Sequence, residues 1–397
     1  MDDPSKEDSP RVLKVLEALK QASHELQAHP RQDFDEPNSS AIKALLELET
    51  ESDTILSKDP NLSSLSQHLS SLKTLIETLQ KCRRHLSLSS FLTRHSISRV
   101  AGSIESEIQA WIDRESVESL TRALRGPKGN EDEDELVRLL TLFEDRLSEG
   151  FNRELQDLVL KSKVFSLLES ILSDPDYSKR VREHSAFAIG ALIRFNKDVF
   201  VGQVLMGPTI RALITMASPH SMKVLCSLIR SIKSPLVDMI ESNGEIPKII
   251  SFLNCQDVQI QVVAMDCILE IGYFGRKEAI DAMLEEGLIK KLVELQRSEL
   301  GCDLIELGQY KNDKENREVS VEVVGKKGEN RERRFLESHP FASCVARFAV
   351  QLEVGEGLRQ REKRAFKQQI LASVREASAS DAEAATMVAE ILWGSSP

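Results

Sequence analysis

The chain has 397 residues, of which 41% are hydrophobic and 29% are charged, and its formal net charge is −11 at pH 7. This acidic balance argues against nucleic acid as the main partner, because a nucleic-acid-binding protein must neutralise phosphates. No run of about 18 apolar residues is present, which argues against a membrane span, and the length leaves room for two or three domains.

The N-terminal part of the chain predicts a helical block. Residues 1–10 are expected to form a disordered tail, and residues 11–125 a helical bundle, because apolar residues such as Leu65, Leu69 and Leu72 recur at helical spacing. Residues 126–135 combine helix breakers with an acidic run, which is typical of a linker between domains.

The C-terminal two thirds repeat one apolar pattern. The line that begins at Gly244 places Ile246, Ile249 and Leu253 on one helical face, and Gly287 opens a similar line. Copies of a short helix, a turn and a longer helix recur about every 40 residues, the period of an α-solenoid. No single unit can bury its own apolar stripe, so stacked neighbours must share one core.

These repeats are expected to occupy residues 136–393. A charged segment at about 307–334 has few large apolar residues and predicts a disordered insertion in the last turns of the solenoid. Ser380 and Glu383 have the spacing of a capping box that starts a final helix. That helix ends at Trp393, which we expect to cover the exposed end of the core.

The longer helix of each unit carries a recognisable motif. Residues 185–192 read SAFAIGAL, and related lines follow at 225–232 and 264–271. They resemble the third helix of the armadillo repeat, whose pattern is roughly Ala-x-Trp-Ala-Leu-x-Asn-Leu. This resemblance implies an all-α fold, in which an N-terminal helical bundle precedes an armadillo-type α-solenoid, a right-handed superhelix.

The N-terminal block adds a second resemblance. Residues 11–125 are similar in order and pattern to the helical domain that precedes the U-box in plant U-box/armadillo ubiquitin ligases. A U-box needs about 70 residues, whereas helical pattern here runs to Leu124 and resumes at Leu136. The chain therefore resembles a U-box-less form of that group, and ligase activity is not implied.

No pattern in the sequence supports catalysis. A GxSxG or HExxH motif is absent, as is any His/Cys cluster at ligand spacing, so we expect no enzyme activity, no metal and no cofactor. The six cysteines include no CxxC pair. They are expected to be reduced core residues of a cytoplasmic or nuclear protein, with the cytoplasm as the first expectation.

Two signals point to regulation or transport, and each has a plainer reading. Ser9 precedes a proline and Ser87 follows two arginines, as in kinase sites, although both fit ordinary surface serines. A basic group resembles a nuclear import signal, although solvated charge in a disordered loop is the commoner explanation of such a group. Its members are Lys326, Lys327, Arg331, Arg333 and Arg334.

The groove lined by the third helices is the expected binding surface. Import-receptor grooves place Trp and Asn where this chain has Phe187 and Ala191, Ser227 and Ser231, and Asp266 and Glu270. We expect an acidic stretch with aromatic edges that takes a peptide carrying basic and apolar residues; the alternative is that this face is merely solvated. The predicted groove residues are Phe187, Arg194, Ser231, Asp266, Glu270 and Tyr273.

The sequence thus predicts a non-enzymatic adaptor or scaffold that binds a protein through the concave face of the solenoid, with no nucleic acid or small-molecule substrate. The alternative is a substrate-recognition subunit of a ubiquitin-ligase complex that acts with a separate U-box protein. A nuclear import receptor is disfavoured, because the Asn ladder is missing and both tryptophans, Trp111 and Trp393, lie outside the repeat motifs.

Overall fold

The structure is a computed structural model of the chain, and every regular element in its described residues is a helix. It describes Leu16, Lys20, Gln21 and residues 63–81, 88–126, 133–301 and 338–393. The chain divides into two compact units. Unit 1 comprises Met1–Arg125 with Asn152–Val164, and unit 2 comprises Gly126–Phe151 with Phe165–Pro397.

Unit 1 is built on one long helix. α4 (Leu88–Arg125) packs against α3 (Ser63–Lys81) and against α6 (Arg153–Lys161). The apolar face of α3 is buried at Leu65, Leu69 and Leu72, as helical spacing requires. α6 follows α5 in the chain, yet it packs on α4, whereas the sequence places all of 136–393 in the repeats. Most of residues 11–62 lies outside the described residues, so the predicted bundle stays a prediction.

Unit 2 is a stack of helices in a repeating order. Its elements begin with α5 (Glu133–Ser148), α7 (Val164–Ser173), α8 (Lys179–Phe195), α9 (Lys197–Met206), α10 (Thr209–Met216) and α11 (Pro219–Ile232). They continue with α12 (Ser234–Ser242), α13 (Ile246–Ser251), the 3-10 turn η3 (Phe252–Asn254), α14 (Val258–Phe274), α15 (Lys277–Glu285) and α16 (Leu288–Arg297). The last three are α19 (Cys344–Val354), α20 (Gln360–Ala377) and α21 (Asp381–Trp393).

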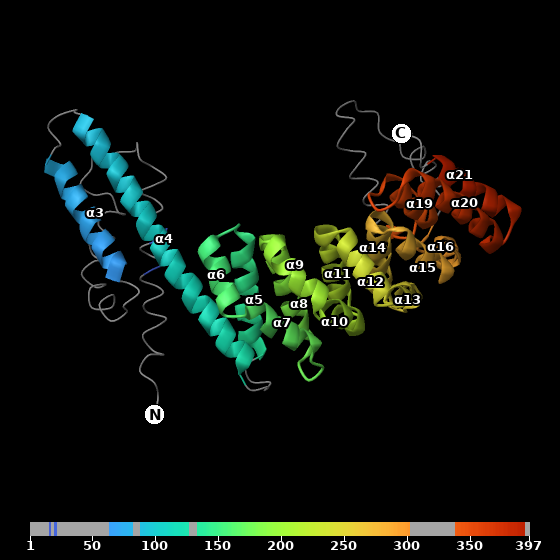
Figure 1. Cartoon of the computed structure of the whole chain (residues 1–397), viewed down its shortest axis with the longest axis horizontal. Coiled ribbons are helices and arrows are strands. Elements are labelled where there is room, and N and C mark those ends of the chain that lie inside the picture. The colour runs from blue at the N-terminus through green and yellow to red at the C-terminus, as the bar shows by residue number, and fades with distance from the viewer. Residues whose placement is uncertain are drawn as a thin grey trace, which may run out of the picture. The chain divides into compact units, whose positions relative to one another are not determined.

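Each full repeat consists of two short helices and one long one. The long, third helices α5, α8, α11, α14 and α19 pack side by side in that order, and the last four follow one another along unit 2 in Figure 1. The predicted stripe of α11 is buried in full, with Leu225, Leu228 and Ile229 at most 1% exposed. Burying such a side chain contributes about 1.5–3 kcal/mol, so the shared core stabilises units that could not fold alone.

The first helix of each repeat is missing from the sequence prediction, which has two helices per unit. α9, α12 and α15 each contain only nine or ten residues. α9 buries just Phe200 and Val204 within its own length, and α12 buries three residues. So few buried apolar residues do not define a helical period in the sequence. These helices are therefore recognised from the structure and not from the sequence pattern.

Gly244 and Gly287 occupy equivalent positions in two successive repeats, and their backbone conformation explains why glycine recurs there. Each follows the first helix of a repeat and precedes the second, with φ of +66° and +75°. The left-handed conformation is costly for a residue with a Cβ atom, and glycine adopts it freely. The recurring glycine therefore turns the chain between α12 and α13, and again between α15 and α16.

The third helices begin at side-chain caps. Ser178 Oγ accepts from the backbone N–H of Val181 at the start of α8. Ser218 and Ser221 form a reciprocal capping box before α11, and Asp257 accepts from the N–H of Gln259 before α14. Each cap satisfies a backbone donor that the first turn leaves unpaired, which contributes about 1 kcal/mol.

The predicted insertion falls between the second and third helices of the last full repeat. α16 and α19 pack together although residues 302–337, which lie outside the described residues, separate them in sequence. Two hydrogen bonds join the flanks: Phe341 N donates to Leu300 O, and Cys344 Sγ donates to Leu292 O at 3.1 Å. The repeat is therefore completed across the insertion.

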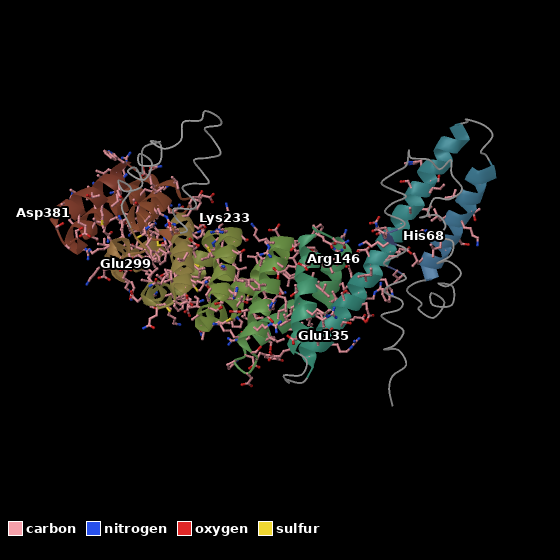
Figure 2. All side chains as sticks on the ribbon, turned by 180° about the vertical axis from the view of Figure 1, so that it is seen from behind. His68, Glu135, Arg146, Lys233, Glu299 and Asp381 are labelled. Atoms are coloured by element: carbon pink, nitrogen blue, oxygen red, sulfur yellow. The ribbon has the colours of Figure 1, made fainter. Side chains whose placement is uncertain are left out.

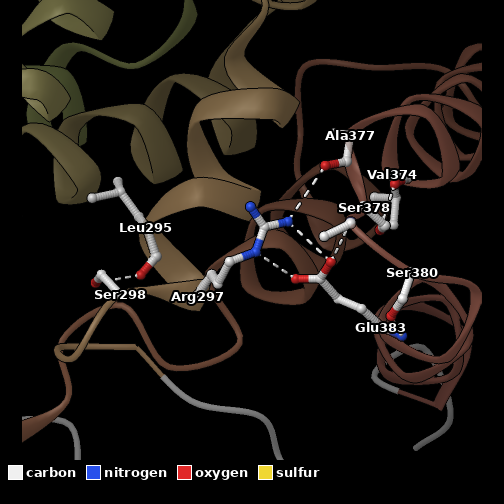
Figure 3. A network of polar contacts seen from close by, with 9 residues as sticks. Leu295, Arg297, Ser298, Val374, Ala377, Ser378, Ser380 and Glu383 are labelled. Atoms are coloured by element: carbon white, nitrogen blue, oxygen red, sulfur yellow. Dashed lines mark hydrogen bonds and ion pairs between the residues drawn. The ribbon is translucent and has the colours of Figure 1, made fainter.

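An exposed ion pair fastens the C-terminal helices to α16 (Figure 3). Arg297 makes two parallel contacts with Glu383, at 2.8 Å from Nε and 2.9 Å from Nη2. Glu383 N donates to Ser380 Oγ, as the predicted capping box requires, and the Glu383 carboxylate accepts from Ala379 N. One side chain thus caps α21 and binds α16.

The expectation for Trp393 is wrong. Its side chain is 75% exposed, and Leu392 beside it is 48% exposed. Met387 and Ile391, on the opposite side of the last turns of α21, are the residues that cover the core. The helical period places only one of the two apolar rows of α21 against its neighbours, and Trp393 belongs to the other row.

Among the described residues, no single helix is long and apolar enough to cross a membrane. Only α9 and α10 taken together reach that length and hydropathy, and they meet at a bend of 69°.

Candidate protein-interaction face

The third helices expose one row of side chains each, all on the same side of unit 2. On α11, His220, Lys223, Ser227 and Arg230 follow one another at intervals of three or four residues, which places them on one helical face. None of the four is buried. We call the surface formed by such rows on α5, α8, α11, α14 and α19 the third-helix face.

All six residues predicted for the groove lie on third helices, and none is buried. They do not form one cluster. Each instead has its own partners on a neighbouring third helix or on its own helix. The residues are Phe187 and Arg194 on α8, Ser231 on α11, and Asp266, Glu270 and Tyr273 on α14.

Phe187 lies at the centre of an aromatic cluster between α8 and α11. The ring of His184 meets it edge-on at a centroid distance of 5.9 Å, and the ring of His220 does so at 5.6 Å. Glu183 Oε2 is 3.3 Å from His220 Nδ1. Burial, together with the charge of Arg180, lowers the pKa of His184, so its imidazole favours the neutral form.

Arg194 joins α8 to α5. Its Nη2 atom lies 3.5 Å from Glu144 Oε1. Burial raises the pKa of Glu144, and the positive charge of Arg194 opposes that rise. The carboxylate is 28% exposed and the guanidinium side chain 49%, so the cation forms the outer half of this pair.

Glu270 and Asp266 are neighbours of cations, not an open acidic stretch. Glu270 Oε1 accepts from Arg230 Nε at 2.6 Å, and this bond raises the pKa of Arg230. Burial raises the pKa of Asp266, while the charges of Arg347, Arg230 and Lys223 oppose the rise. The negative charge predicted for this surface is therefore offset by basic side chains on α11 and α19, the helices that flank α14.

Ser231 and Tyr273 are also engaged. Ser231 Oγ donates to the carbonyl of Ser227 on its own helix at 2.9 Å. The Tyr273 ring stacks edge-on against Phe274, with centroids 4.7 Å apart, and its carbonyl accepts from the N–H groups of Glu356 and Gly357. Neither Ser231 nor Glu270 is therefore free to clamp a peptide backbone as an asparagine would.

Another cation lies beside the C-terminal end of α14. Lys233, labelled in Figure 2, precedes α12 and lies 3.0 Å from Glu356 Oε2. Its Nζ atom is also 5.5 Å from the centroid of the Phe274 ring, within cation–π distance. The lysine and its carboxylate partner are about equally exposed, so their charges offset each other at this end of α14.

Sequence reasoning missed the partner residues of the face, above all Arg230, His220, Glu144 and Arg347. A signal for one of them exists, because Arg230 and Glu270 are separated by 40 residues, about one repeat. Oppositely charged side chains one repeat apart can therefore form an ion pair between neighbouring third helices. The spacing of Arg194 and Glu144, 50 residues, departs from the period and could not be found this way.

The other predicted residues lie outside the described residues. These are the two predicted phosphorylation sites, Ser9 and Ser87, and the predicted import signal, Lys326, Lys327, Arg331, Arg333 and Arg334. Cys82 and Cys302 also lie outside them, whereas Cys226, Cys267 and Cys344 are buried and Cys255 is half-buried.

Two surface hollows lie away from the six predicted residues. One, of about 230 Å³, lies between α19 and α20, where Lys363 Nζ donates to the carbonyls of Glu353 and Gly355 and so caps the end of α19. The other, of about 330 Å³, lies beside Glu169 and Pro208. Within the described residues, no group of three His, Cys, Asp or Glu side chains is placed to hold a metal ion.

Stacked units of two short helices and one long helix, with the long helices side by side, define an armadillo-type α-solenoid. This is the class of protein that the repeats predict.

No protein-family model matches the chain, and no curated protein matches it. Among solved structures, the designed armadillo repeat protein YIII(Dq)4CqI has a TM-score of 0.42 and 15% identity, covering 69% of this chain and 98% of its own. The designed armadillo repeat protein YIII(Dq.V1)4CPAF in complex with peptide (KR)4 has a TM-score of 0.41 and 17% identity, covering 70% and 98%. An engineered protein has a TM-score of 0.39 and 13% identity, covering 96% and 98%. The third-helix face is defined by this chain's own helices and contacts, independently of these structures.

Proposed function

We propose that the protein is a non-catalytic adaptor that binds an extended segment of another protein along the third-helix face. The observation that carries this proposal is the row of partly exposed polar and aromatic side chains on five successive third helices. Interaxial distances of about 8–10 Å give such a row a length of about 40 Å, which matches about 12 residues of extended chain.

Recognition would depend on the partner's side chains more than on its backbone. The positions that would clamp a backbone hold Ala191, Ser231 and Glu270, of which the last two already bond within unit 2. Phe187 and its flanking histidines offer an apolar surface, and Arg194 and Arg230 offer charge. An interface of ordinary size, about 800 Å² per partner, fits on this row.

Obstruction of the face tests the proposal. Ser231→Trp places a bulky side chain at the middle of the third-helix face without changing charge. Ser242→Trp is the matched control, because Ser242 is exposed on α12, a first helix. Both serines bond only to a carbonyl of their own helix, at Ser227 and Met239, so neither change removes a contact between helices.

The measurement is affinity purification of the wild type and both variants, with bound proteins quantified by mass spectrometry. We expect Ser231→Trp to lose specific partners that Ser242→Trp retains. Partners that stay on both variants would place binding elsewhere, with unit 1 as the next surface to test.

The ubiquitin-ligase reading rests on the resemblance of residues 11–125 alone and stays a prediction. A chain of that kind would co-purify with a U-box protein and would lose it when residues 1–125 are deleted.

A further inference from the structure

Most charged pairs of the third-helix face share one orientation. Among the described residues four pairs join successive third helices, and in three of them the basic side chain is the more exposed partner. Arg194 is 49% exposed against 28% for Glu144, Arg230 is 59% exposed against 20% for Glu270, and His220 is 55% exposed against 15% for Glu183. The exception is Arg180 with Asp134, between α8 and α5, where the carboxylate is 88% exposed and the guanidinium side chain 58%.

The lengths of the side chains explain this orientation. A glutamate between two helices keeps its carboxylate close to the helix surface, whereas an arginine lays its stem along the surface and carries its charge outward. Asp266 follows the same rule, because its carboxyl is largely desolvated beneath the charges of Arg347, Arg230 and Lys223. Lys223 is itself exposed and has no ion-pair partner among the described residues.

Around Phe187, Arg194 and Arg230, an approaching molecule would therefore meet guanidinium, ammonium and imidazole groups before the carboxylates of Glu144, Glu183 and Glu270. The outward cations recur on α8 and α11, as Arg194, Lys223 and Arg230, so positive charge is spaced along the row and not confined to one point. This local sign opposes that of the whole chain, whose net charge is −11. Long-range repulsion disfavours an acidic ligand, so any preference for one must come from this face.

We propose that the third-helix face binds an acidic segment of its partner, whose Asp or Glu side chains contact Arg194, Arg230 and Lys223. An aromatic or aliphatic side chain of the same segment packs on Phe187 and its histidine neighbours. This inference rests on the proposed function and names its ligand chemistry. It replaces the basic peptide expected from Asp266 and Glu270, since those carboxylates lie behind the cations.

Two peptides of equal length test the charge preference. Fluorescein-labelled (Glu-Glu-Phe)4 and (Lys-Lys-Phe)4 would be titrated with the full-length chain in low salt, with anisotropy as the readout. We expect the acidic peptide to bind at least about tenfold more tightly than the basic one, and added salt to weaken it.

Matched variants assign the binding to the face. Arg194→Gln/Arg230→Gln removes two outward cations of the third-helix face. Lys277→Gln/Lys290→Gln removes two exposed cations from α15 and α16, the first and second helices of a repeat. Each exposed charge contact accounts for about threefold in affinity, so the first pair should weaken the acidic peptide about tenfold and the control pair less than twofold. Circular dichroism melts would establish that both variants are folded.

Three outcomes would overturn the inference: tighter binding of the basic peptide, an equal loss in both double variants, or no binding of either peptide. A loss of natural partners from Ser231→Trp combined with any of these would leave the adaptor function standing and reject only the acidic ligand.

Discussion

Arg230 Nε lies 2.6 Å from Glu270 Oε1, and this bond joins α11 to α14 across the middle of the third-helix face. Glu270 is a residue that the sequence marks as part of an acidic groove. The bond places it beneath a guanidinium group that is 59% exposed. The sign of the surface is therefore set by which member of the pair lies outside, and not by a count of charged residues.

This geometry predicts unequal effects of removing the two partners. Arg230→Gln leaves the largely covered Glu270 beside Asp266 without its nearest cation, which we expect to destabilise the fold by about 1 kcal/mol. Glu270→Gln leaves an exposed arginine in water and should cost less than about 0.5 kcal/mol. Denaturant midpoints of the two variants at one pH and ionic strength would compare them. Equal losses would show that the carboxylate is as well solvated as the guanidinium.

A second prediction concerns two glycines inside helices. Gly272 of α14 faces α19, and a Cβ atom there would lie 3.0 Å from Cε2 of Phe348, a ring that is fully buried. Gly202 of α9 has no atom within 4 Å of its own Cβ position. Alanine in a helix is favoured over glycine by about 1 kcal/mol, so Gly202→Ala should raise the melting temperature.

For Gly272→Ala that gain is opposed by overpacking, which costs about 1–3 kcal/mol when the neighbour cannot move. We expect no gain or a loss, and partial recovery when Phe348→Leu is combined with it. A melting temperature that rises equally for both glycines would show that α19 can shift away from α14.

The repeat core could be predicted from sequence, because its buried apolar residues recur at helical spacing. Leu225 and Ile229 on α11, with Ile268 and Ile271 on α14, are assigned to the core by spacing alone, and all are fully buried. The recurring glycines at 244 and 287 likewise indicate a local backbone requirement, the left-handed conformation between two helices. These features depend on neighbours in the chain, which a sequence shows directly.

The face could not be predicted as well, because its properties depend on pairs of residues about a repeat apart. The sequence shows that Asp266 and Glu270 are acidic but not that Arg230 and Arg347 approach them from α11 and α19. Arg347 follows the insertion in the chain, so no fixed period relates it to Asp266. The exposed position of Trp393 was missed for a similar reason, since which row of α21 is covered depends on its neighbours.

The pKa of Asp266 leads to a prediction about pH. Burial raises this pKa above that of the unfolded chain, so the folded state binds the proton more tightly. The resulting stabilisation is fully present below the unfolded pKa, about 3.9, and is lost as pH rises through the folded pKa. At pH 7 the ionised carboxylate therefore destabilises the fold.

Asp266→Asn removes that penalty, and we expect it to melt at a higher temperature than the wild type at pH 7. The advantage should shrink as pH falls towards 4. Melting curves between pH 4 and pH 8 would measure it. A lower melting temperature for Asp266→Asn at pH 7 would show that attraction to Arg347 and Arg230 outweighs burial.

Cysteine reactivity gives a further prediction. Burial raises the pKa of Cys344 to about 12, and its Sγ donates to the carbonyl of Leu292. Cys267 is fully buried with a raised pKa, caused first by a hydrogen bond with Cys226. The thiolate is the reactive species, so these thiols should be inert in the folded chain.

A variant with Cys82→Ser and Cys302→Ser retains the four described cysteines. At pH 8 we expect a disulfide reagent to modify Cys255 alone, since it is the one of the four that is not buried. Guanidinium should expose all four. Rapid modification of Cys344 in the native chain would indicate that α19 separates readily from α16.

The last prediction concerns the contact between Arg297 and Glu383, which holds α21 and α16 together (Figure 3). Hydrogen bonding to Arg297 lowers the pKa of Glu383, so the carboxylate stays ionised at neutral pH. Glu383→Ala removes both this pair and the bond to Ala379 N, which together contribute about 1 kcal/mol.

Local opening of α21 should then become about fivefold more frequent. Hydrogen–deuterium exchange measures it directly, because amides of α21 would exchange faster while those of α11 would not change. Glu376→Ala is the matched control, since Glu376 is an exposed carboxylate of α20. If α21 exchanged equally fast in both variants, burial of Met387 and Ile391 and the hydrogen bonds that the buried Glu390 accepts from Gln296 and Ser343 would be enough to hold the helix in place.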